Sequence, residues 1–379
     1  MRFTLVSTQK DIGGGEILLR SIGHQLQLDG HSVSWIGRGD SELVKRMDAN
    51  QRLLYSLRGR GRNVGDIRTV RSRLRNWAPD VLIMNDTHSV MLGGLATLGW
   101  KRNRPIRLAY KHTVFPLRSR LKYQLLTDSV VCVSEAARKK ILEGGLSQKN
   151  TKLIYGGIHP PEPQLDQVAR AQFREQLGIS AGTLLIVAIG NLLPVKGHAE
   201  LIEALRRFSE HSAENASNFR LLIAGEGTQR AALEEQISAS RLTSQVQLLG
   251  FRSDSNRLIE AADLLIHPSH LEGLSLVLIQ AQMLQKPIMA TAVGGAAEVL
   301  NVGQSDCASR WVIDANNPAS ITAQLQAATE ELHRSDRLAE RQADLQQVAA
   351  DARERFSLKT NSTKLVEFAA ELSGKRNAA

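Results

Sequence analysis

The sequence contains few of the residues that build disulfide frameworks, metal sites or membrane spans. Its 379 residues include two cysteines, Cys132 and Cys307, whose spacing fits neither a zinc site nor a redox pair. We interpret both as structural thiols in a reducing compartment. The longest uncharged apolar stretches, residues 90–100 and 183–195, are shorter than the roughly 20 residues that cross a bilayer. Residues 1–6 lack a signal-peptide cleavage pattern and are predicted to be a buried strand, so we expect a cytoplasmic protein.

Aromatic residues are also scarce, at 4% of the sequence, and no stacking platform or recognition-helix pattern accompanies the basic residues. Nucleic acid is therefore not an expected partner, although the calculated pI is 9.8. The charge is unevenly distributed. Residues 1–160 contain 27 Lys and Arg against 12 Asp and Glu, a net charge of +15, whereas residues 161–379 contain 21 against 26, a net charge of −5. The two halves are thus expected to have different partners.

The densest group of basic residues is interleaved with apolar side chains. We call it the basic cluster, and its members are Arg58, Arg60, Arg62, Arg68, Arg71, Arg73 and Arg75. Such a stretch suits an anionic membrane surface, which would place the protein peripherally on the inner face of the cytoplasmic membrane, or a phosphorylated acceptor. The alternative is the solvated basic face of one packed helix, and the sequence does not decide between the two interpretations.

Short apolar strands alternate with helical patterns along the chain, which predicts an α/β protein of about two domains. Residues 156–163 hold three prolines and two glycines and form the best linker candidate. Helices are expected near the end of the chain at residues 318–332, 336–353 and 358–372. Strands are expected at residues 3–7, 33–36, 81–84, 107–110, 130–133, 152–155, 184–189, 220–224, 245–248, 264–267 and 287–291.

The most informative segment is residues 263–298, where a strand, a polar loop and a helix follow one another. Glu272 follows the strand, at the edge where open α/β sheets bind ligands. The backbone N–H groups of residues 273–275 are predicted to be first-turn donors without acceptors, which suit a diphosphate. A tight turn at residues 294–295 is expected to face the same crevice, because glycine lets the backbone approach a ligand.

Two other glycine-containing loops follow predicted strands. Residues 190–197 include Lys196, whose ammonium could stabilise the negative charge of a leaving diphosphate. As an ordinary surface lysine at a helix start, Lys196 would be placed unfavourably beside the positive end of the helix. Residues 13–15 precede the first predicted helix, and their backbone N–H groups could approach an anion.

These motifs resemble the signature of the retaining GT-B glycosyltransferases of family 4. In that family a Glu, seven residues and a second Glu are followed by a Gly-Gly-x-x-Glu turn. Here the first Glu is Glu272, the second position is Gln280 and the turn ends at Glu298. The loop with Lys196 is similar to the family's Gly-Arg-x-x-x-x-Lys-Gly loop, with Asn191 in place of the arginine. Gln280 and Asn191 keep hydrogen-bonding groups but lack the charge.

The resemblance implies a GT-B fold, in which two Rossmann-like doubly wound domains face a central cleft. Residues 1–157 would bind the acceptor, residues 164–355 would bind the nucleotide sugar, and a helix near residues 356–376 would cross back to the first domain. Catalytic roles are implied for His112, Lys196 and Glu272. Substrate-binding roles are implied for Gly14, Gly15, Gly190, Asn191, Lys196, Gly225, Gly227, Phe251, Arg252, Gly273, Leu274, Ser275 and Gln280.

In the family, the residue at Glu272 binds hydroxyls of the donor sugar, and the residue at Gln280 accepts from the nucleotide ribose. The lysine at Lys196 clamps the diphosphate, and a histidine at His112 lies beside the reacting sugar. An ordinary hydrogen-bonded loop histidine is the alternative for His112. The resemblance also implies that the departing phosphate oxygen helps to take the acceptor proton, while Glu272 and His112 position the sugar.

The predicted function is a retaining glycosyltransferase that moves a hexose or related sugar from a nucleoside diphosphate sugar to a cell-envelope acceptor. That acceptor would be a glycan or glycolipid, such as lipopolysaccharide core or a lipid-linked saccharide. A UDP-sugar is favoured over a GDP-sugar. Since no Asp-x-Asp motif and no metal-ligand spacing occur, we expect no metal and no cofactor. A nucleotide-sugar 2-epimerase and a non-catalytic scaffold of the same fold stay open as alternatives.

Overall fold

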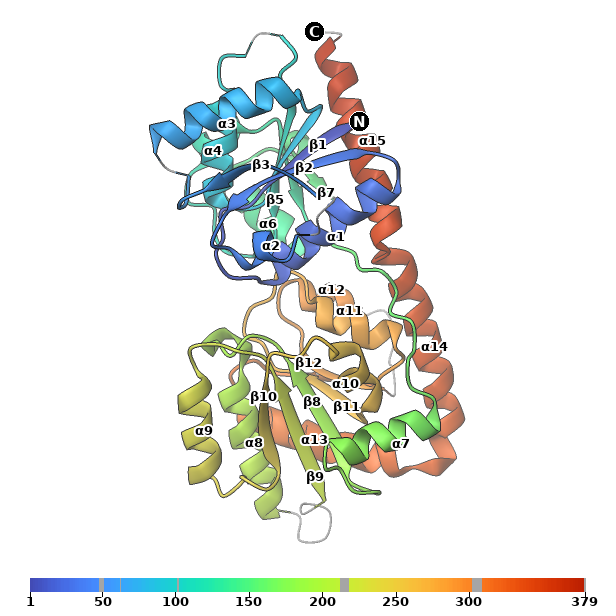
Figure 1. Cartoon of the computed structure of the whole chain (residues 1–379). Coiled ribbons are helices and arrows are strands. Elements are labelled where there is room, and N and C mark those ends of the chain that lie inside the picture. The colour runs from blue at the N-terminus through green and yellow to red at the C-terminus, as the bar shows by residue number, and fades with distance from the viewer. Residues whose placement is uncertain (48–50, 62, 101, 212–217, 302–308, 378–379) are drawn as a thin grey trace. The chain divides into compact units, whose positions relative to one another are not determined.

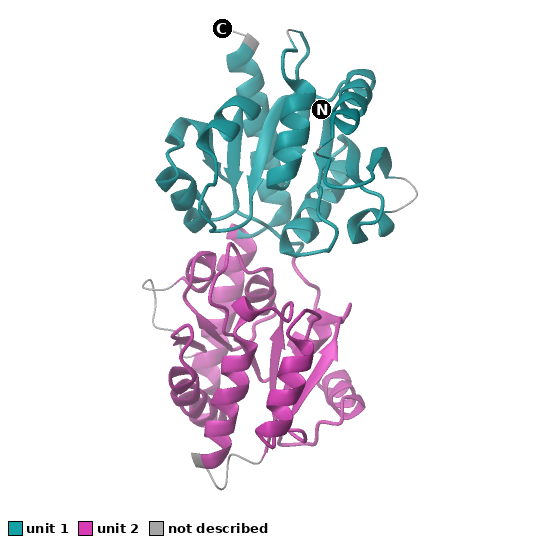
Figure 2. Cartoon of the chain, turned by 90° about the vertical axis from the view of Figure 1, so that its left-hand side faces the viewer, with its two compact units in different colours: residues 1–159, 356–379 teal, residues 160–355 magenta. Residues whose placement is uncertain are grey.

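The computed structural model describes residues 1–47, 51–61, 63–100, 102–211, 218–301 and 309–377. The chain divides into two compact units, shown in separate colours in Figure 2. Unit 1 comprises residues 1–159 and 356–379, and unit 2 comprises residues 160–355. The closing helix near the carboxyl terminus, α15 (Leu358–Asn377), thus belongs to the same unit as the amino-terminal half of the chain.

Unit 1 is built on a seven-stranded sheet in which all neighbouring strands are parallel (Figure 1). Its central strands are buried runs of Val, Ile and Leu, as parallel strands covered on both faces require. Across the sheet, the strands are β3 (Arg52–Leu57), β2 (Ser32–Arg38), β1 (Arg2–Val6), β4 (Val81–Met84), β5 (Ile106–Lys111), β6 (Ser129–Cys132) and β7 (Thr151–Leu153).

Helices connect these strands and cover the sheet of unit 1. Four of them share one hydrophobic core with the sheet: α3 (Val64–Trp77), α4 (Thr87–Thr97), α5 (Arg120–Leu126) and α6 (Glu135–Glu143). Helix α1 (Gly14–Leu28) packs at Gly23 against the buried ring of Trp35 and contacts α15. The short elements are α2 (Glu42–Lys45) and η1 (Gln148–Asn150).

Unit 2 has a six-stranded sheet, again parallel throughout. Across the sheet, the strands are β10 (Val246–Gly250), β9 (Phe219–Ala224), β8 (Leu184–Ile189), β11 (Leu264–His267), β12 (Ile288–Thr291) and β13 (Arg310–Ile313). The main core lies between this sheet and α8 (His198–His211), α9 (Arg230–Ala239) and α13 (Pro318–His333). The other elements are α7 (Gln167–Gln176), η2 (Pro194–Lys196), α10 (Ser255–Ala261), α11 (Leu276–Met283), α12 (Gly295–Leu300), η3 (Ser335–Arg337) and α14 (Leu338–Arg355).

Each sheet reverses its strand order at one point, between β1 and β4 in unit 1 and between β8 and β11 in unit 2. The loops that follow two such strands leave in opposite directions and open a crevice at the carboxyl edge of the sheet. In unit 2 these two loops carry Lys196 and Glu272. The topology therefore brings together two residues that are 76 positions apart in the sequence.

The predicted α/β class is confirmed, and each of the eleven predicted strands overlaps a strand of the structure. Two further strands, β3 and β13, were not predicted. Both lie at the edge of their sheet, where polar residues are tolerated and the apolar pattern is weak. Cys132 is buried with a free thiol, whose pKa burial raises to about 12. Cys307 lies outside the described residues.

Only part of the basic cluster lies on one helix, since Arg68, Arg71, Arg73 and Arg75 are on α3 whereas Arg58 and Arg60 precede it. Its described members lie after β3 and along α3, and Arg62 lies outside the described residues. The Arg71 guanidinium donates to the carbonyl oxygens of Ala96 and Leu98, at 3.2 and 2.8 Å, and thus holds the end of α4. In contrast, the side chains of Arg58, Arg60, Arg68 and Arg73 are exposed. None of the described helices combines the length and the hydrophobicity that a membrane span requires.

Candidate active site

The carboxylate of Glu272 lies at the centre of a polar cluster in unit 2, on the loop between β11 and α11. One oxygen, Oε1, accepts hydrogen bonds from His267 Nε2 at 2.9 Å and from Ser269 Oγ at 2.8 Å. The same oxygen forms an ion pair with Lys196 Nζ. The side chain of Glu272 is only 8% exposed. Three donors, from the end of β11, the loop after it and the loop after β8, therefore hold this buried carboxylate in one orientation.

This environment keeps Glu272 charged. Burial alone would raise the pKa of the carboxyl, but the hydrogen bond and charge of His267, with the charge and hydrogen bond of Lys196, outweigh it and lower the pKa to about 2. All the contacts fall on Oε1. The second oxygen, Oε2, has no hydrogen-bond partner among the described residues and is not one of the buried polar atoms left unpaired. Oε2 is thus an open, charged acceptor at the carboxyl edge of the sheet.

The loop that carries Lys196 is clamped on both sides by backbone contacts that only glycine permits. A Cβ atom at Gly225 would overlap the carbonyl oxygen of Gly190, and one at Gly197 would overlap that of Pro268. Gly197 also has a φ of 70°, in the region that favours glycine. The amide of His270 donates to Val195 O at 2.8 Å. The loops after β8, β9 and β11 are therefore locked together, which fixes Lys196 beside Glu272.

The predicted diphosphate donors, Gly273, Leu274 and Ser275, precede the helix and do not form its first turn. Helix α11 begins at Leu276, because Ser275 is the N-cap and its Oγ accepts from the amide of Leu278 at 3.4 Å. The amides of residues 273–275 nevertheless donate to no acceptor among the described residues. The turn at Gly294–Gly295 packs directly on this segment, since Gly295 N donates to Glu272 O at 2.9 Å.

The other predicted donor-site residues lie on loops at the same edge or on α11. Asn191 is exposed and Gln280 is partly exposed, whereas Gly225 and Gly227 pack against the backbone of residues 190–192. Phe251 is 58% exposed after β10. The guanidinium of Arg252 is held by Asp254 through two hydrogen bonds of 2.8 and 2.6 Å. Arg252 is therefore engaged within the protein, and a ligand would have to share it.

In unit 1, the predicted residues gather at the carboxyl edge of the other sheet. Gly14 and Gly15 form the first turn of α1, whereas the sequence analysis placed them before this helix. His112 follows β5, and its Nε2 lies 2.6 Å from Asn85 Oδ1. A Cβ atom at Gly15 would lie 3.3 Å from the ring of His112, so glycine lets the ring pack closely on α1. Burial, with the charge of Lys111, lowers the pKa of His112 to about 4 and keeps the ring neutral.

Sequence reasoning missed several polar residues that support these predicted groups. His267 and Ser269 hold Glu272, and Asn85 holds His112. His198 is buried beneath the loop at Gly190, with its ring close to the backbone of Gly190 and Asn191. Glu16 had a readable signal, since it stands three residues after the N-cap Gly13, whose amide donates to the Glu16 carboxylate at 3.2 Å as in one half of a capping box. The others depend on contacts between segments far apart in the sequence.

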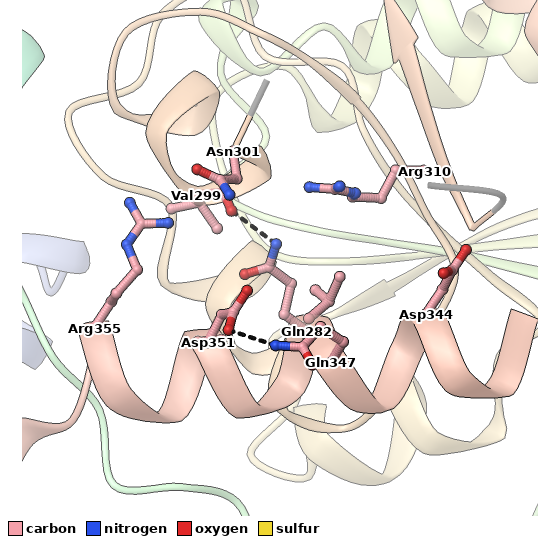
Figure 3. Close-up of a pocket in the computed structure, with 10 residues that line it drawn as sticks. Gln282, Val299, Asn301, Arg310, Asp344, Gln347, Asp351 and Arg355 are labelled. Atoms are coloured by element: carbon pink, nitrogen blue, oxygen red, sulfur yellow. Dashed lines mark hydrogen bonds between the residues drawn. The ribbon is translucent and has the colours of Figure 1, made fainter. Parts of the chain in front are cut away.

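Two cavities of unit 2 lie away from this cluster. One, of about 110 Å³, is lined by α11, α12, β13 and α14, and Figure 3 shows Gln282 donating there to Val299 O at 2.7 Å. The other, of about 880 Å³, is lined partly by Arg170, Arg174 and Lys286. Their cationic groups hydrogen-bond carbonyl oxygens at the end of α10, and the two arginines also pair with Asp263. No described residue that lines either cavity is a predicted site residue.

Comparison with known proteins identifies the family. The model described as Glycosyl transferases group 1 matches residues 169–344, and the model described as Glycosyltransferase Family 4 matches residues 12–161. The chain belongs to the family 4 glycosyltransferases. Its fold agrees with this membership: the Anabaena protein Alr3699/HepE, solved in complex with UDP and glucose, superposes with a TM-score of 0.81. That match covers 98% of this chain and 99% of the other at 20% identity, and with the two parallel sheets it shows the GT-B fold.

The curated relatives of this family 4 glycosyltransferase are distant. The lipopolysaccharide glucosyltransferase WaaG of Escherichia coli is 26% identical over 196 residues, which are 51% of this chain and 49% of WaaG. An uncharacterized glycosyltransferase of Methanocaldococcus jannaschii is 28% identical over 197 residues, which are 51% of this chain and 48% of that protein. The chain thus spans about half the length of these curated relatives. Within its described residues, no group of three or more His, Cys, Asp and Glu is placed to hold a metal ion.

The structure predicts that Glu272→Gln destabilises unit 2. The change removes the negative charge that pairs with Lys196. It also leaves the donors of His267 and Ser269 imperfectly paired, which costs roughly 1–3 kcal/mol. Urea unfolding, followed by fluorescence, measures the difference. Glu210→Gln is the matched control, because the Glu210 side chain is 56% exposed and pairs only at the surface with Arg206. Its effect should stay within about 0.5 kcal/mol, and equal effects of both substitutions would contradict the proposed importance of the pair.

Proposed function

We propose that this family 4 protein is a retaining glycosyltransferase, which moves a hexose or related sugar from a nucleoside diphosphate sugar to a cell-envelope glycan or glycolipid. The observation that carries the proposal is the joint placement of Lys196, Glu272 and the amides of residues 273–275 at one sheet edge. A diphosphate sugar needs a cation and N–H donors for its phosphates and an acceptor for its hydroxyls. This edge offers all three.

In this proposal, Lys196 and the amides of residues 273–275 bind the diphosphate, and Glu272 Oε2 accepts from a sugar hydroxyl. Their charges suit the reaction, because negative charge grows on the diphosphate as the bond from the anomeric carbon to its oxygen breaks. The acceptor hydroxyl forms the new bond to that carbon, and its proton passes to the departing phosphate oxygen. His112 in unit 1 is proposed as the second residue that positions the sugar.

A UDP-sugar is the proposed donor, in preference to a GDP-sugar. The support is the likeness of fold to HepE, which was solved with UDP and glucose. The exposed ring of Phe251, after β10, would lie beside the base. Lys196 and backbone N–H groups would meet the diphosphate charge, so we propose that no metal is required. Transfer from a labelled UDP-sugar in the presence of a chelator tests this part, and loss of transfer on chelation would contradict it.

Binding of nucleoside diphosphates tests the donor site directly. We expect UDP to raise the melting temperature by several degrees and by more than GDP, ADP or TDP, since a ligand that binds only the folded state stabilises it. Lys196→Met should abolish most of the shift, because it removes the cation of the diphosphate site. Lys149→Met, at an exposed lysine of unit 1, is the control and should keep the full shift. Equal shifts with all four nucleotides, or an unchanged shift in Lys196→Met, would contradict the proposal.

The acceptor is proposed to be presented at a membrane, as lipopolysaccharide core or a lipid-linked saccharide. WaaG is named as a lipopolysaccharide glucosyltransferase, which supports an envelope acceptor. The net charge of +15 over residues 1–160 supports attraction to anionic lipid. Four exposed arginines of the basic cluster, Arg58, Arg60, Arg68 and Arg73, are the proposed contacts; Arg75 is exposed as well. This would hold the protein peripherally on the inner face of the cytoplasmic membrane.

Vesicle sedimentation tests the membrane contact. The chain should sediment with vesicles that contain an anionic phospholipid and dissociate as salt rises, because salt screens exposed charges. Changing Arg58, Arg60, Arg68 and Arg73 to Gln should weaken binding by up to roughly 1,000-fold, because each cation near the surface contributes about 1 kcal/mol. A control with the same loss of charge changes Arg207, Arg230, Arg241 and Arg334 of unit 2. Binding that ignores salt and lipid charge, or equal losses in both variants, would overturn the proposal.

A further inference from the structure

Three buried or partly buried polar side chains in unit 1 form a hydrogen-bonded triad that ends at His112. The imidazole Nε2 lies 2.6 Å from Asn85 Oδ1, and Asn85 Nδ2 donates to Glu16 Oε1 at 3.1 Å. Asn85 is 4% exposed and Glu16 is 8% exposed. The three residues follow or face the strands β1, β4 and β5, so they lie at the point where this sheet reverses its strand order. The triad therefore lies at the carboxyl edge of the sheet of unit 1.

The carboxylate of Glu16 fixes the orientation of the Asn85 amide. Both Glu16 oxygens already accept hydrogen bonds: Oε2 from the Gly13 amide at 3.2 Å, and Oε1 from Asn85 Nδ2 and from Ser7 Oγ at 3.5 Å. Burial raises the pKa of Glu16, whereas the N–H groups of Gly13 and Asn85, which donate to its two oxygens, favour the ionised form. The positive end of α1 favours this anion. An ionised carboxylate only accepts, and therefore the NH2 group of Asn85 must face it.

The orientation of Asn85 in turn sets the tautomer of His112. With Nδ2 turned to Glu16, Asn85 presents its carbonyl oxygen to the imidazole, which must then donate from Nε2. A neutral imidazole carries one proton, so Nδ1 keeps a lone pair. Nδ1 has no hydrogen-bond partner among the described residues and is not among the buried unpaired atoms. It therefore lies open to solvent as an acceptor.

Packing holds the ring in this position. On one side, the Cδ2 and Cγ atoms of His112 pack closely on Gly15, in the first turn of α1. The ring of Tyr110 stacks on the imidazole, with the ring centroids 5.6 Å apart and an angle of 29° between the planes. These contacts fix the plane of the ring, and the hydrogen bond between Nε2 and Asn85 fixes which nitrogen points away from Asn85, so the direction of Nδ1 is set as well as its protonation.

We propose that Glu16 and Asn85 are positioning residues that hold His112 as the Nε2–H tautomer, so that Nδ1 accepts a hydrogen bond from a substrate hydroxyl. The contact with a sugar hydroxyl rests on the proposed function, whereas the tautomer does not. Glu16 and Asn85 thus leave His112 neutral, with Nδ1 as an acceptor. Such a group suits a ligand that donates a hydrogen bond at this point, such as an alcohol, and not an anion.

Glu16→Gln is the decisive substitution, because an amide has one accepting oxygen and one donating NH2 group. The Gly13 amide needs the oxygen, so the new NH2 group faces Asn85. Asn85 must then rotate its amide and present Nδ2 to His112, and the imidazole changes to the Nδ1–H tautomer. Nδ1 would no longer accept. Asp66→Asn is the matched control. Asp66 is another buried carboxylate in the first turn of a helix of unit 1, and it does not contact Glu16, Asn85 or His112.

Long-range ¹H–¹⁵N spectra of the full chain at neutral pH report the tautomer, with the His112 signals assigned by their loss in His112→Gln. We expect one Nε2–H tautomer in the wild type and in Asp66→Asn, and more than half Nδ1–H in Glu16→Gln. A mixture or Nδ1–H in the wild type would overturn the proposal, as would an unchanged ring in a folded Glu16→Gln variant.

A second variant covers the case in which Glu16→Gln does not fold. Asn85→Asp places a carboxylate against Nε2, between the charges of Glu16 and Lys111, and should raise the midpoint of the His112 titration by at least about one pH unit. An unchanged midpoint would show that Asn85 does not face the ring. Because His112 Nδ1 would then donate and no longer accept, Glu16→Gln should lower kcat/KM at least tenfold. Adding His112→Ala to this variant should cause little further loss. If no sugar is transferred at all, the proposed function fails while the spectra still decide the tautomer.

Discussion

The candidate site depends on the ion pair between Lys196 and Glu272, and the pair depends on the order of the strands. Since β8 and β11 are parallel neighbours at the reversal of the sheet, the loops that follow them meet at one edge. Glycines at positions 197 and 225 then allow backbone contacts that exclude any side chain. The fold thus brings a lysine and a carboxylate together and buries the carboxylate, instead of leaving them as separate surface charges.

The two oxygens of the Glu272 carboxylate have different roles in this arrangement. Oε1 takes the contacts with His267, Ser269 and Lys196, which hold the group in place and keep it ionised. Oε2 is left for a ligand. A diphosphate at residues 273–275 would compete with Glu272 for the ammonium of Lys196, so donor binding and the position of the carboxylate are coupled. In unit 1, His112 shows the same division, with Nε2 held by Asn85 and Nδ1 left open.

Much of the fold could be predicted from the sequence, because buried parallel strands produce continuous apolar runs. The edge strands β3 and β13 were missed, since one side of an edge strand lacks a partner and each of these two strands begins with an arginine, Arg52 or Arg310. Lys196 and Glu272 could be proposed from local motifs, but their direct contact could not, because it arises from tertiary packing. The same holds for His267, which the sequence presents as the end of a strand. The helix starts at Gly14 and Leu276 differ from expectation because capping side chains, not apolar periodicity, decide where a helix begins.

The edge of the sheet that contains Lys196, Glu272 and residues 273–275 is proposed to bind a diphosphate. A crystal structure of the full chain with UDP tests this proposal most directly. We predict phosphate oxygens within hydrogen-bond distance of Lys196 Nζ and of at least two amides of residues 273–275. A diphosphate bound instead in the cavity lined by Arg170, Arg174 and Lys286, with Lys196 still paired only to Glu272, would contradict the account.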